Sequence, residues 1–94
     1  MANVKPNKKM LSGVKVLDFT QYLAGPAATR LFADFGAEVI KIENPNDGGD
    51  MARSVGPHFF GPHDSLFYHS LNRNKKSFTL DLSRPESRPV FHEL

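Results

Sequence analysis

Two short apolar runs stand at either end of an amphipathic segment in the first half of the chain. Residues 14–19 (VKVLDF) and 38–43 (EVIKIE) are short and rich in β-branched residues, which is typical of strands buried on both faces of a parallel sheet. The segment between them is long enough for a crossover helix. Residues 11–43 therefore predict one βαβ unit.

The intervening helix is predicted from its apolar spacing. Ala28, Leu31, Phe32 and Phe35 recur at the period of one helix face, so we expect this stripe to pack on the sheet. Gly36 stands where a left-handed C-cap would end the helix. Pro26, not counted in the stripe, suits the first helical position.

The second half begins with a segment that has no sustained period. Residues 44–64 contain four glycines, three prolines and three aspartates, which predicts a long loop of about twenty residues that is functional or disordered. Ser65 can cap a short helix that runs through Leu71, and residues 77–82 alternate as a third strand. Ser83 and Glu86 have the spacing of a capping box that starts a last helix.

The predicted order is β-α-β-loop-α-β-α, an open α/β arrangement around a parallel sheet. Residues 1–10 are polar and basic, which predicts a flexible leader and shows no signal-peptide pattern. Residues 11–94 are expected to be the N-terminal part of a larger, incomplete domain, because the last helix should cross back to a further parallel strand. The formal net charge of +2 is too small to indicate nucleic acid, and no apolar run approaches the ~20 residues of a membrane helix. The chain has no cysteine, which fits a soluble, cytoplasmic protein, and its four histidines lack metal-ligand spacing.

Ligands in open α/β sheets collect at the carboxyl ends of strands, so the turn at residues 20–26 is the first candidate site. The small residues Ala24 and Gly25 would permit close approach of a ligand, although an ordinary tight turn explains them equally well. Glu43 ends the second strand, where a nucleotide-binding fold often places a ribose-binding acid. This supports an NAD-type Rossmann domain as a remote alternative, but Gly25 is the only glycine in the turn.

Four blocks of the sequence carry a family resemblance. They are L-x-G-x-x-V-L-D, A-G-P, D-x-G-A-x-V-I-K-I-E and N-R-x-K-x-S-x-x-L-D-L, in this order. With them, residues 11–94 resemble the N-terminal segment of the family III CoA-transferases. This CaiB/BaiF family includes formyl-CoA transferases and α-methylacyl-CoA racemases.

The resemblance implies a Rossmann-like large domain that holds CoA and an interlocked homodimer. It also implies transfer of CoA between carboxylic acids, in which an aspartate attacks an acyl-CoA thioester to give a mixed anhydride. The family's catalytic aspartate lies in a later segment, so the resemblance assigns no catalytic residue to this chain. CoA or acyl-CoA and a carboxylic acid would be substrates, with no permanently bound cofactor.

The resemblance also implies residues that bind CoA. Leu23, Ala24 and Gly25 would line the channel near the thioester. Formyl-CoA transferases carry glutamine at the position of Leu23, and leucine cannot donate its hydrogen bond, which argues against a formyl or oxalate specialisation. Asn44 stands where some members carry a CoA-contacting arginine.

A second group follows from the last block. The segment Leu80, Asp81, Leu82 and Ser83 aligns with a strand end that contacts the adenine end of CoA, although Asp81 and Ser83 could serve only as a helix cap. Lys75, with its neighbours Arg73 and Lys76, could face the CoA phosphates, or the three could form a solvated basic turn.

Three hypotheses remain for the function. The chain is part of a CoA-transferase, a non-catalytic short form that binds CoA or forms dimers, or a truncation without function.

Overall fold

The computed structural model describes residues 9–94, so most of the leader predicted at residues 1–10 lies outside the described residues. The main elements follow the predicted order. They are β1 (Lys15–Asp18), α1 (Ala24–Asp34), β2 (Glu38–Glu43), α2 (Leu66–Asn72), β5 (Lys76–Thr79) and α3 (Ser87–Glu93).

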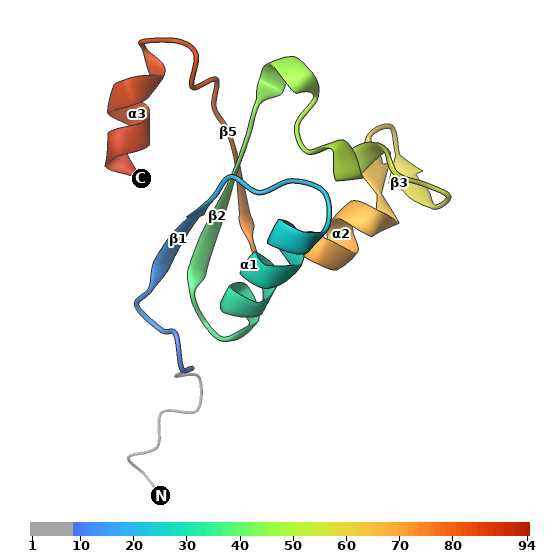
Figure 1. Ribbon diagram of the computed structural model, residues 1–94, viewed down its shortest axis with the longest axis horizontal. Coiled ribbons are helices and arrows are strands. Elements are labelled where there is room, and N and C mark those ends of the chain that lie inside the picture. The colour runs from blue at the N-terminus through green and yellow to red at the C-terminus, as the bar shows by residue number, and fades with distance from the viewer. Residues whose placement is uncertain (1–8) are drawn as a thin grey trace, which may run out of the picture.

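The main sheet has three parallel strands in the order β1-β2-β5, with β2 in the centre (Figure 1). The register pairs Lys15 with Glu38 and Ile40 with Lys76. Figure 1 shows α1 and α2 together beside the sheet, whereas α3 lies beyond the end of β5 on the other side. The predicted α/β class with a parallel sheet is confirmed.

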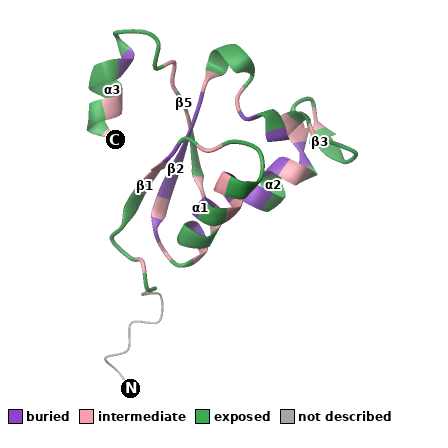
Figure 2. Ribbon diagram, in the orientation of Figure 1, coloured by how far each residue is buried: buried purple, intermediate pink, exposed green. Residues whose placement is uncertain are grey.

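Helix α1 packs on the sheet through a different face from the one predicted. Its buried residues are Pro26, Thr29 and Ala33. The predicted stripe instead points outward, with Phe32 46% and Phe35 50% exposed. Small side chains allow the helix to lie close to β2, so the larger apolar residues remain on the outer face (Figure 2).

The two ends of α1 are formed differently. The helix begins at Ala24, before the predicted first position at Pro26, and its N-cap residue Leu23 makes no side-chain hydrogen bond. At the other end Gly36 has φ of +106°, and its N–H donates to the Ala33 carbonyl over 3.0 Å. The predicted glycine C-cap is confirmed, because this left-handed conformation strongly favours glycine.

Residues 44–64 contain regular structure that the sequence pattern did not predict. Two 3-10 helices, η1 (Pro45–Asp47) and η2 (Met51–Ser54), are followed by the hairpin of β3 (Phe59–Gly61) and β4 (Asp64–Ser65). Side-chain caps stabilise the short helices: Asn44 accepts from the N–H of Asn46, and Asp50 accepts from that of Ala52. These turns have no helical period, which is why the pattern missed them.

The C-terminal part also differs from the prediction. Strand β5 ends at Thr79, and α3 begins at Ser87 rather than next to Ser83. The capping box is wrong because Ser83 serves a preceding turn, in which its N–H donates to Asp81 Oδ1 over 3.0 Å. Helix α3 meets the end of β1 through Phe91 and Phe19, whose ring centroids lie 6.0 Å apart.

Candidate functional site

A cavity of about 180 Å³ opens at the carboxyl ends of β2 and β5. This is the edge at which open α/β sheets bind ligands. The volume is below the roughly 300–1,000 Å³ of sites for whole drug-sized ligands, so the cavity suits one part of a larger molecule. The structure brings together five residues singled out from the sequence with three others; the lining is Phe19, Gln21, Ile42, Asn44, Leu80, Asp81, Leu82 and Ser83.

The polar groups of this cavity are held by hydrogen bonds to one another and to Asn46 and Asp47 of η1. Asp81 accepts from Asn46 Nδ2 over 2.7 Å and from the Ser83 backbone N–H. These donors, with the Ser83 hydroxyl foremost, hold the pKa of Asp81 below its usual range. Asn44 receives the Asn46 N–H and donates to Asp47 over 3.3 Å. These contacts place fixed polar groups in the wall beside the apolar side chains of Leu80 and Leu82.

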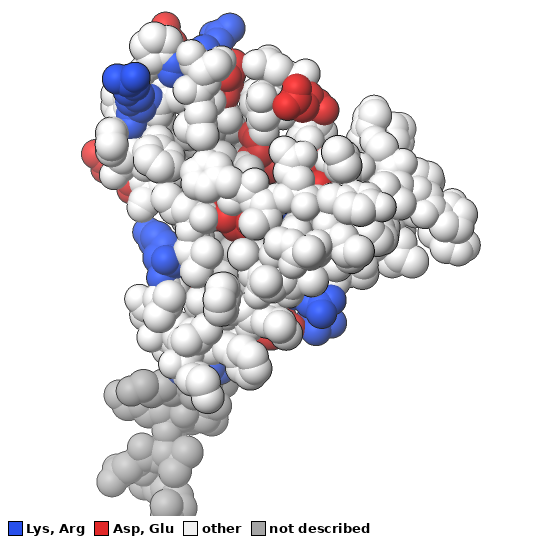
Figure 3. Space-filling view, in the orientation of Figure 1, with Lys and Arg blue, Asp and Glu red and all other residues white. Residues whose placement is uncertain are grey.

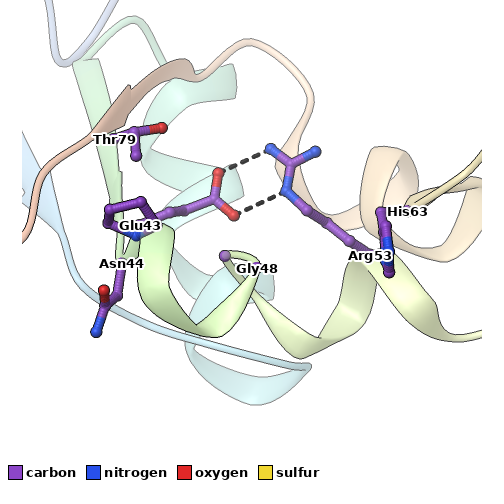
Figure 4. Close-up of a pocket in the computed structure, with 8 residues that line it drawn as sticks. Glu43, Asn44, Gly48, Arg53, His63 and Thr79 are labelled. Carbon is purple, nitrogen blue, oxygen red and sulfur yellow. Dashed lines mark hydrogen bonds and ion pairs between the residues drawn. The ribbon is translucent and has the colours of Figure 1, made fainter.

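A second cavity, of about 270 Å³, shares Asn44 with the first as a lining residue (Figure 4). Its wall contains Glu43, whose two carboxylate oxygens each accept a 2.8 Å hydrogen bond from Arg53. Burial would raise the pKa of Glu43, but Arg53 and the Asp50 N–H lower it to about 2. Because Arg53 binds both carboxylate oxygens, Glu43 stabilises the fold and does not present a free carboxylate to a ligand. The ribose-binding role considered for an NAD-type domain finds no support here.

Two buried ion pairs lie beneath the turn between β1 and α1. Lys41 Nζ lies 2.8 Å from Asp50 Oδ2, and the two side chains are 1% and 0% exposed. Lys41 also donates to the Thr20 carbonyl over 2.8 Å, and Asp50 accepts from the Tyr22 N–H over 2.9 Å. Burial would raise the pKa of Asp50, but Lys41 and the N–H groups of Ala52 and Tyr22 hold it below its usual range.

The second pair joins Lys75 to Asp18. Lys75 Nζ lies 3.0 Å from Asp18 Oδ2 and donates to the Pro26 carbonyl over 3.1 Å, and its side chain is 2% exposed. The expectation that Lys75 is an exposed cation facing phosphates is therefore wrong. Burial lowers the pKa of Lys75, while the contact with Asp18 opposes this shift. Lys76, its neighbour, is the exposed one, with a side chain 69% exposed.

The three turn residues predicted from the resemblance are not among those that line the cavity. Leu23 is 46% exposed at the start of α1. Gly25 packs so closely against Thr20 that a Cβ added to Gly25 would lie 2.5 Å from the Thr20 Cβ. Gly25 does not have a positive φ, so this contact explains the need for glycine. Ala24, also exposed, is the first residue of the helix.

The sequence reasoning singled out the turn at residues 20–26 without naming Gln21 within it, and it missed Lys41, Asp50 and Arg53. A signal was present in β2, where Lys41 and Glu43 alternate with isoleucines in a strand predicted to be buried on both faces. Buried charges require partners, so two such residues in one central strand indicate counter-charges elsewhere. The pattern of residues 44–64 could not identify which residues supply them.

The described residues 9–94 contain no helix long and apolar enough to cross a membrane. In the same range no three acidic or histidine side chains gather in a way that would bind a metal ion. Charged side chains are scattered over the face seen in Figure 3, with uncharged surface between them.

Comparisons with known proteins agree on one family. The chain is 48% identical to human succinyl-CoA:glutarate CoA-transferase over 94 residues, which is 100% of this chain and 20% of the relative. It is 46% identical to formyl-CoA:oxalate CoA-transferase of Bradyrhizobium diazoefficiens over 86 residues, 92% of this chain and 20% of that one. The chain thus spans about a fifth of the length of these curated relatives.

Solved structures match as well. A CaiB/BaiF family protein from Brucella suis has a TM-score of 0.78 and 35% identity over 90% of this chain and 23% of its own. A hypothetical protein from Mycobacterium tuberculosis has a TM-score of 0.74 and 41% identity over 90% of this chain and 22% of its own. The family model of CoA-transferase family III matches residues 11–94. The chain belongs to CoA-transferase family III.

Proposed function

We propose that this chain provides a CoA-binding part of an acyl-CoA:carboxylate CoA-transferase. The observation that carries the proposal is the cavity at the carboxyl ends of β2 and β5, which gathers Asn44 and residues 80–83. In the proposed reaction an aspartate outside this chain attacks an acyl-CoA thioester. This attack gives a mixed anhydride and releases CoA thiolate, which then attacks the aspartyl carbonyl, so that the donor acid leaves and an aspartyl-CoA thioester forms. The acceptor carboxylate displaces CoA from that thioester to form a second anhydride, and CoA thiolate attacks its acceptor carbonyl to give the new acyl-CoA and free the aspartate.

The residues of the cavity suit one end of CoA. Leu80 and Leu82 offer apolar contact to a purine ring, and Asn44 and Ser83 offer hydrogen bonds to its polar edge or to the ribose. Lys75 has no direct contact in this proposal, since it is buried against Asp18. CoA is a substrate here and no resident cofactor is required.

Leu23, Ala24 and Gly25 would lie toward the thioester end of CoA. The exposure of Leu23 and Ala24 supports this part of the proposal. A leucine at position 23 cannot donate a hydrogen bond to an acyl intermediate, which favours a carboxylate pair other than formate and oxalate. The relatives named for succinyl-CoA and glutarate point to dicarboxylic acids as the first substrates to assay.

The proposal includes an interlocked homodimer in the cytoplasm, as the resemblance implies. Large apolar side chains on the surface of the described residues support an assembly, among them Phe60 at 70% exposure and Met51 at 59%. The lack of cysteine is compatible with a reducing compartment.

Calorimetric titration of CoA into the 94-residue chain tests the proposal. Leu82 lines the cavity and Leu31 lies on the outer face of α1, and both are 49% exposed. Leu82→Glu introduces a carboxylate that repels the CoA phosphates and obstructs the cavity, so we expect it to weaken binding at least about tenfold. Leu31→Glu adds the same charge away from the cavity and serves as the matched control.

Equal binding by Leu82→Glu and Leu31→Glu would reject the cavity as the CoA site. A wild-type chain that binds no CoA would reject the proposed function itself. The same preparation, mixed with succinyl-CoA and glutarate, is expected to form no glutaryl-CoA above a mock preparation. The buried carboxylates of Asp18, Glu43 and Asp50 are not available as nucleophiles, because each is paired with a cation.

A further inference from the structure

Gln21 is the one cavity residue whose two flanking backbone groups are both held by a single buried ion pair. Gln21 lines the cavity at the ends of β2 and β5. The carbonyl of Thr20, just before it, accepts from Lys41 Nζ over 2.8 Å. The N–H of Tyr22, just after it, donates to Asp50 Oδ1 over 2.9 Å. Lys41 and Asp50 are themselves paired at 2.8 Å.

We propose that Lys41 and Asp50 are positioning residues that fix Gln21 in the wall of the CoA cavity without touching CoA. This inference rests on the proposed function for its ligand. Both side chains are almost wholly buried, so neither can reach a molecule in the cavity. They act through the two peptide groups on either side of Gln21.

The conformation of Tyr22 supports this role. Its φ is +73°, a left-handed conformation that is unusual for a residue with a large side chain. The bond from its N–H to Asp50 stabilises that conformation, since Asp50 is anchored in turn by Lys41 and by capping the Ala52 N–H. Without these contacts the strained turn can relax, and Gln21 would leave its place in the wall.

The ion pair is a costly way to hold a turn if stability is its only purpose. Apolar side chains of similar size often replace a buried ion pair at no loss of stability. The pair does, however, supply one donor and one acceptor at fixed positions, which apolar residues cannot. Its arrangement around Gln21 therefore points to positioning of the site.

Two double variants separate positioning from simple stability. Lys41→Met with Asp50→Asn removes both charges but keeps a side-chain oxygen for the Tyr22 N–H. Lys41→Met with Asp50→Leu removes both charges and that oxygen. Both lose the contact with Thr20, so the difference between them reports the hydrogen bonds that the side chain of residue 50 accepts from the N–H groups of Tyr22 and Ala52. We expect the asparagine double variant to bind CoA about tenfold more tightly than the leucine double variant.

Amide hydrogen exchange supplies a readout on the turn itself. We expect the Tyr22 N–H to be protected in the wild-type chain and in the asparagine double variant, and to exchange faster in the leucine double variant. A wild-type Tyr22 N–H that exchanges like that of an unstructured peptide would overturn the inference, whether or not either variant folds.

The same two double variants, each combined with Gln21→Ala, test whether the ion pair acts through Gln21. If the pair acts through Gln21, the difference in CoA affinity between the two double variants should disappear once Gln21 is truncated. A difference that persists there, or equal affinity of the two double variants with Gln21 intact, would overturn the inference. A wild-type chain that binds no CoA rejects the proposed function and with it the role in the CoA site, while the Tyr22 exchange rates still show whether the pair holds the turn.

Discussion

Thr20 and Gly25 meet across the turn between β1 and α1 so closely that no side chain fits on Gly25. A Cβ at Gly25 would lie 2.5 Å from the Thr20 Cβ and 2.7 Å from its Cγ2. Thr20 cannot move away freely, because its N–H and hydroxyl both bond to Asp18 Oδ1. The glycine is therefore required by the fold of the turn, whatever ligand lies beside it.

Gly25→Ala should destabilise the chain by about 1–3 kcal/mol, the usual cost of forcing extra atoms into a packed site. Removing the opposing side chain in Thr20→Gly with Gly25→Ala should recover part of that loss. Urea unfolding of the wild type, both single variants and the double variant measures the coupling. Simple additivity of the two single effects would show that the two residues do not clash.

Lys75 and Lys76 are neighbours in the chain with opposite surroundings, which makes them a matched pair. Lys75→Ala leaves Asp18 buried without its cation, so we expect a loss of about 3–5 kcal/mol in the free energy of unfolding. Lys76→Ala removes an exposed cation and should change stability little. Chemical unfolding in low and high salt checks this, and a loss in Lys75→Ala that fades with salt would contradict its burial.

Glu43 should make the chain sensitive to acid. Its pKa is lowered from an ordinary 4.5 to about 2, so its contribution to stability is complete above pH 4.5 and is lost as the pH falls toward 2. That contribution is on the order of 3 kcal/mol for a shift of this size. Glu43→Gln should be less stable than the wild type at pH 7 and lose less stability between pH 5 and 2.

Thermal unfolding across this pH range tests the expectation for Glu43. Glu86→Gln provides the control, since it removes an exposed carboxylate that lies outside the buried ion pairs. Some acid sensitivity should remain in Glu43→Gln, because the pKa values of Asp18 and Asp50 are also lowered. Identical profiles for Glu43→Gln and the wild type would contradict the role given to the Arg53 pair.

The outer face of α1 should promote association. Phe32 and Phe35 are about half exposed, so Phe32→Ser with Phe35→Ser should reduce self-association and binding of a hydrophobic dye with little loss of stability. Ala33→Leu, on the buried face of the same helix, should destabilise instead. Sedimentation velocity and dye fluorescence test this. Strong unfolding in the phenylalanine double variant would show that those rings support the core.

The fold could be predicted as far as periodicity reaches. Residues 14–19 and 38–43 have a strand pattern, and the left-handed glycine at Gly36 could be placed from the end of the helical period. The orientation of α1 could not, because the largest apolar side chains suggested the wrong face. What decides the contact is how closely the helix must approach β2, and small residues such as Ala33 allow the closest approach.

Part of the candidate site was predicted from the family resemblance. The resemblance singled out Asn44 and residues 80–83, which the structure brings together at the carboxyl ends of β2 and β5. Lys41 and Asp50 depend on contacts between segments that no local pattern connects. Lys75 was misjudged because a run of basic residues resembles a solvated turn, and only the packing of Asp18 beneath it reveals the burial.

The alternation of charge along β2 has a consequence for how the sheet assembles. Lys41 pairs with Asp50 and Glu43 pairs with Arg53, so both charged side chains lie on the same face of β2. Ile40, between Val39 and Lys41 in the alternation, lies in register with Leu17 of the neighbouring strand β1. A shift of β2 by one residue would turn both charges to the opposite face, away from every counter-charge. Such a mispaired sheet would bury two unsatisfied ions, so the charged residues select the native alignment of the strands over its nearest competitors.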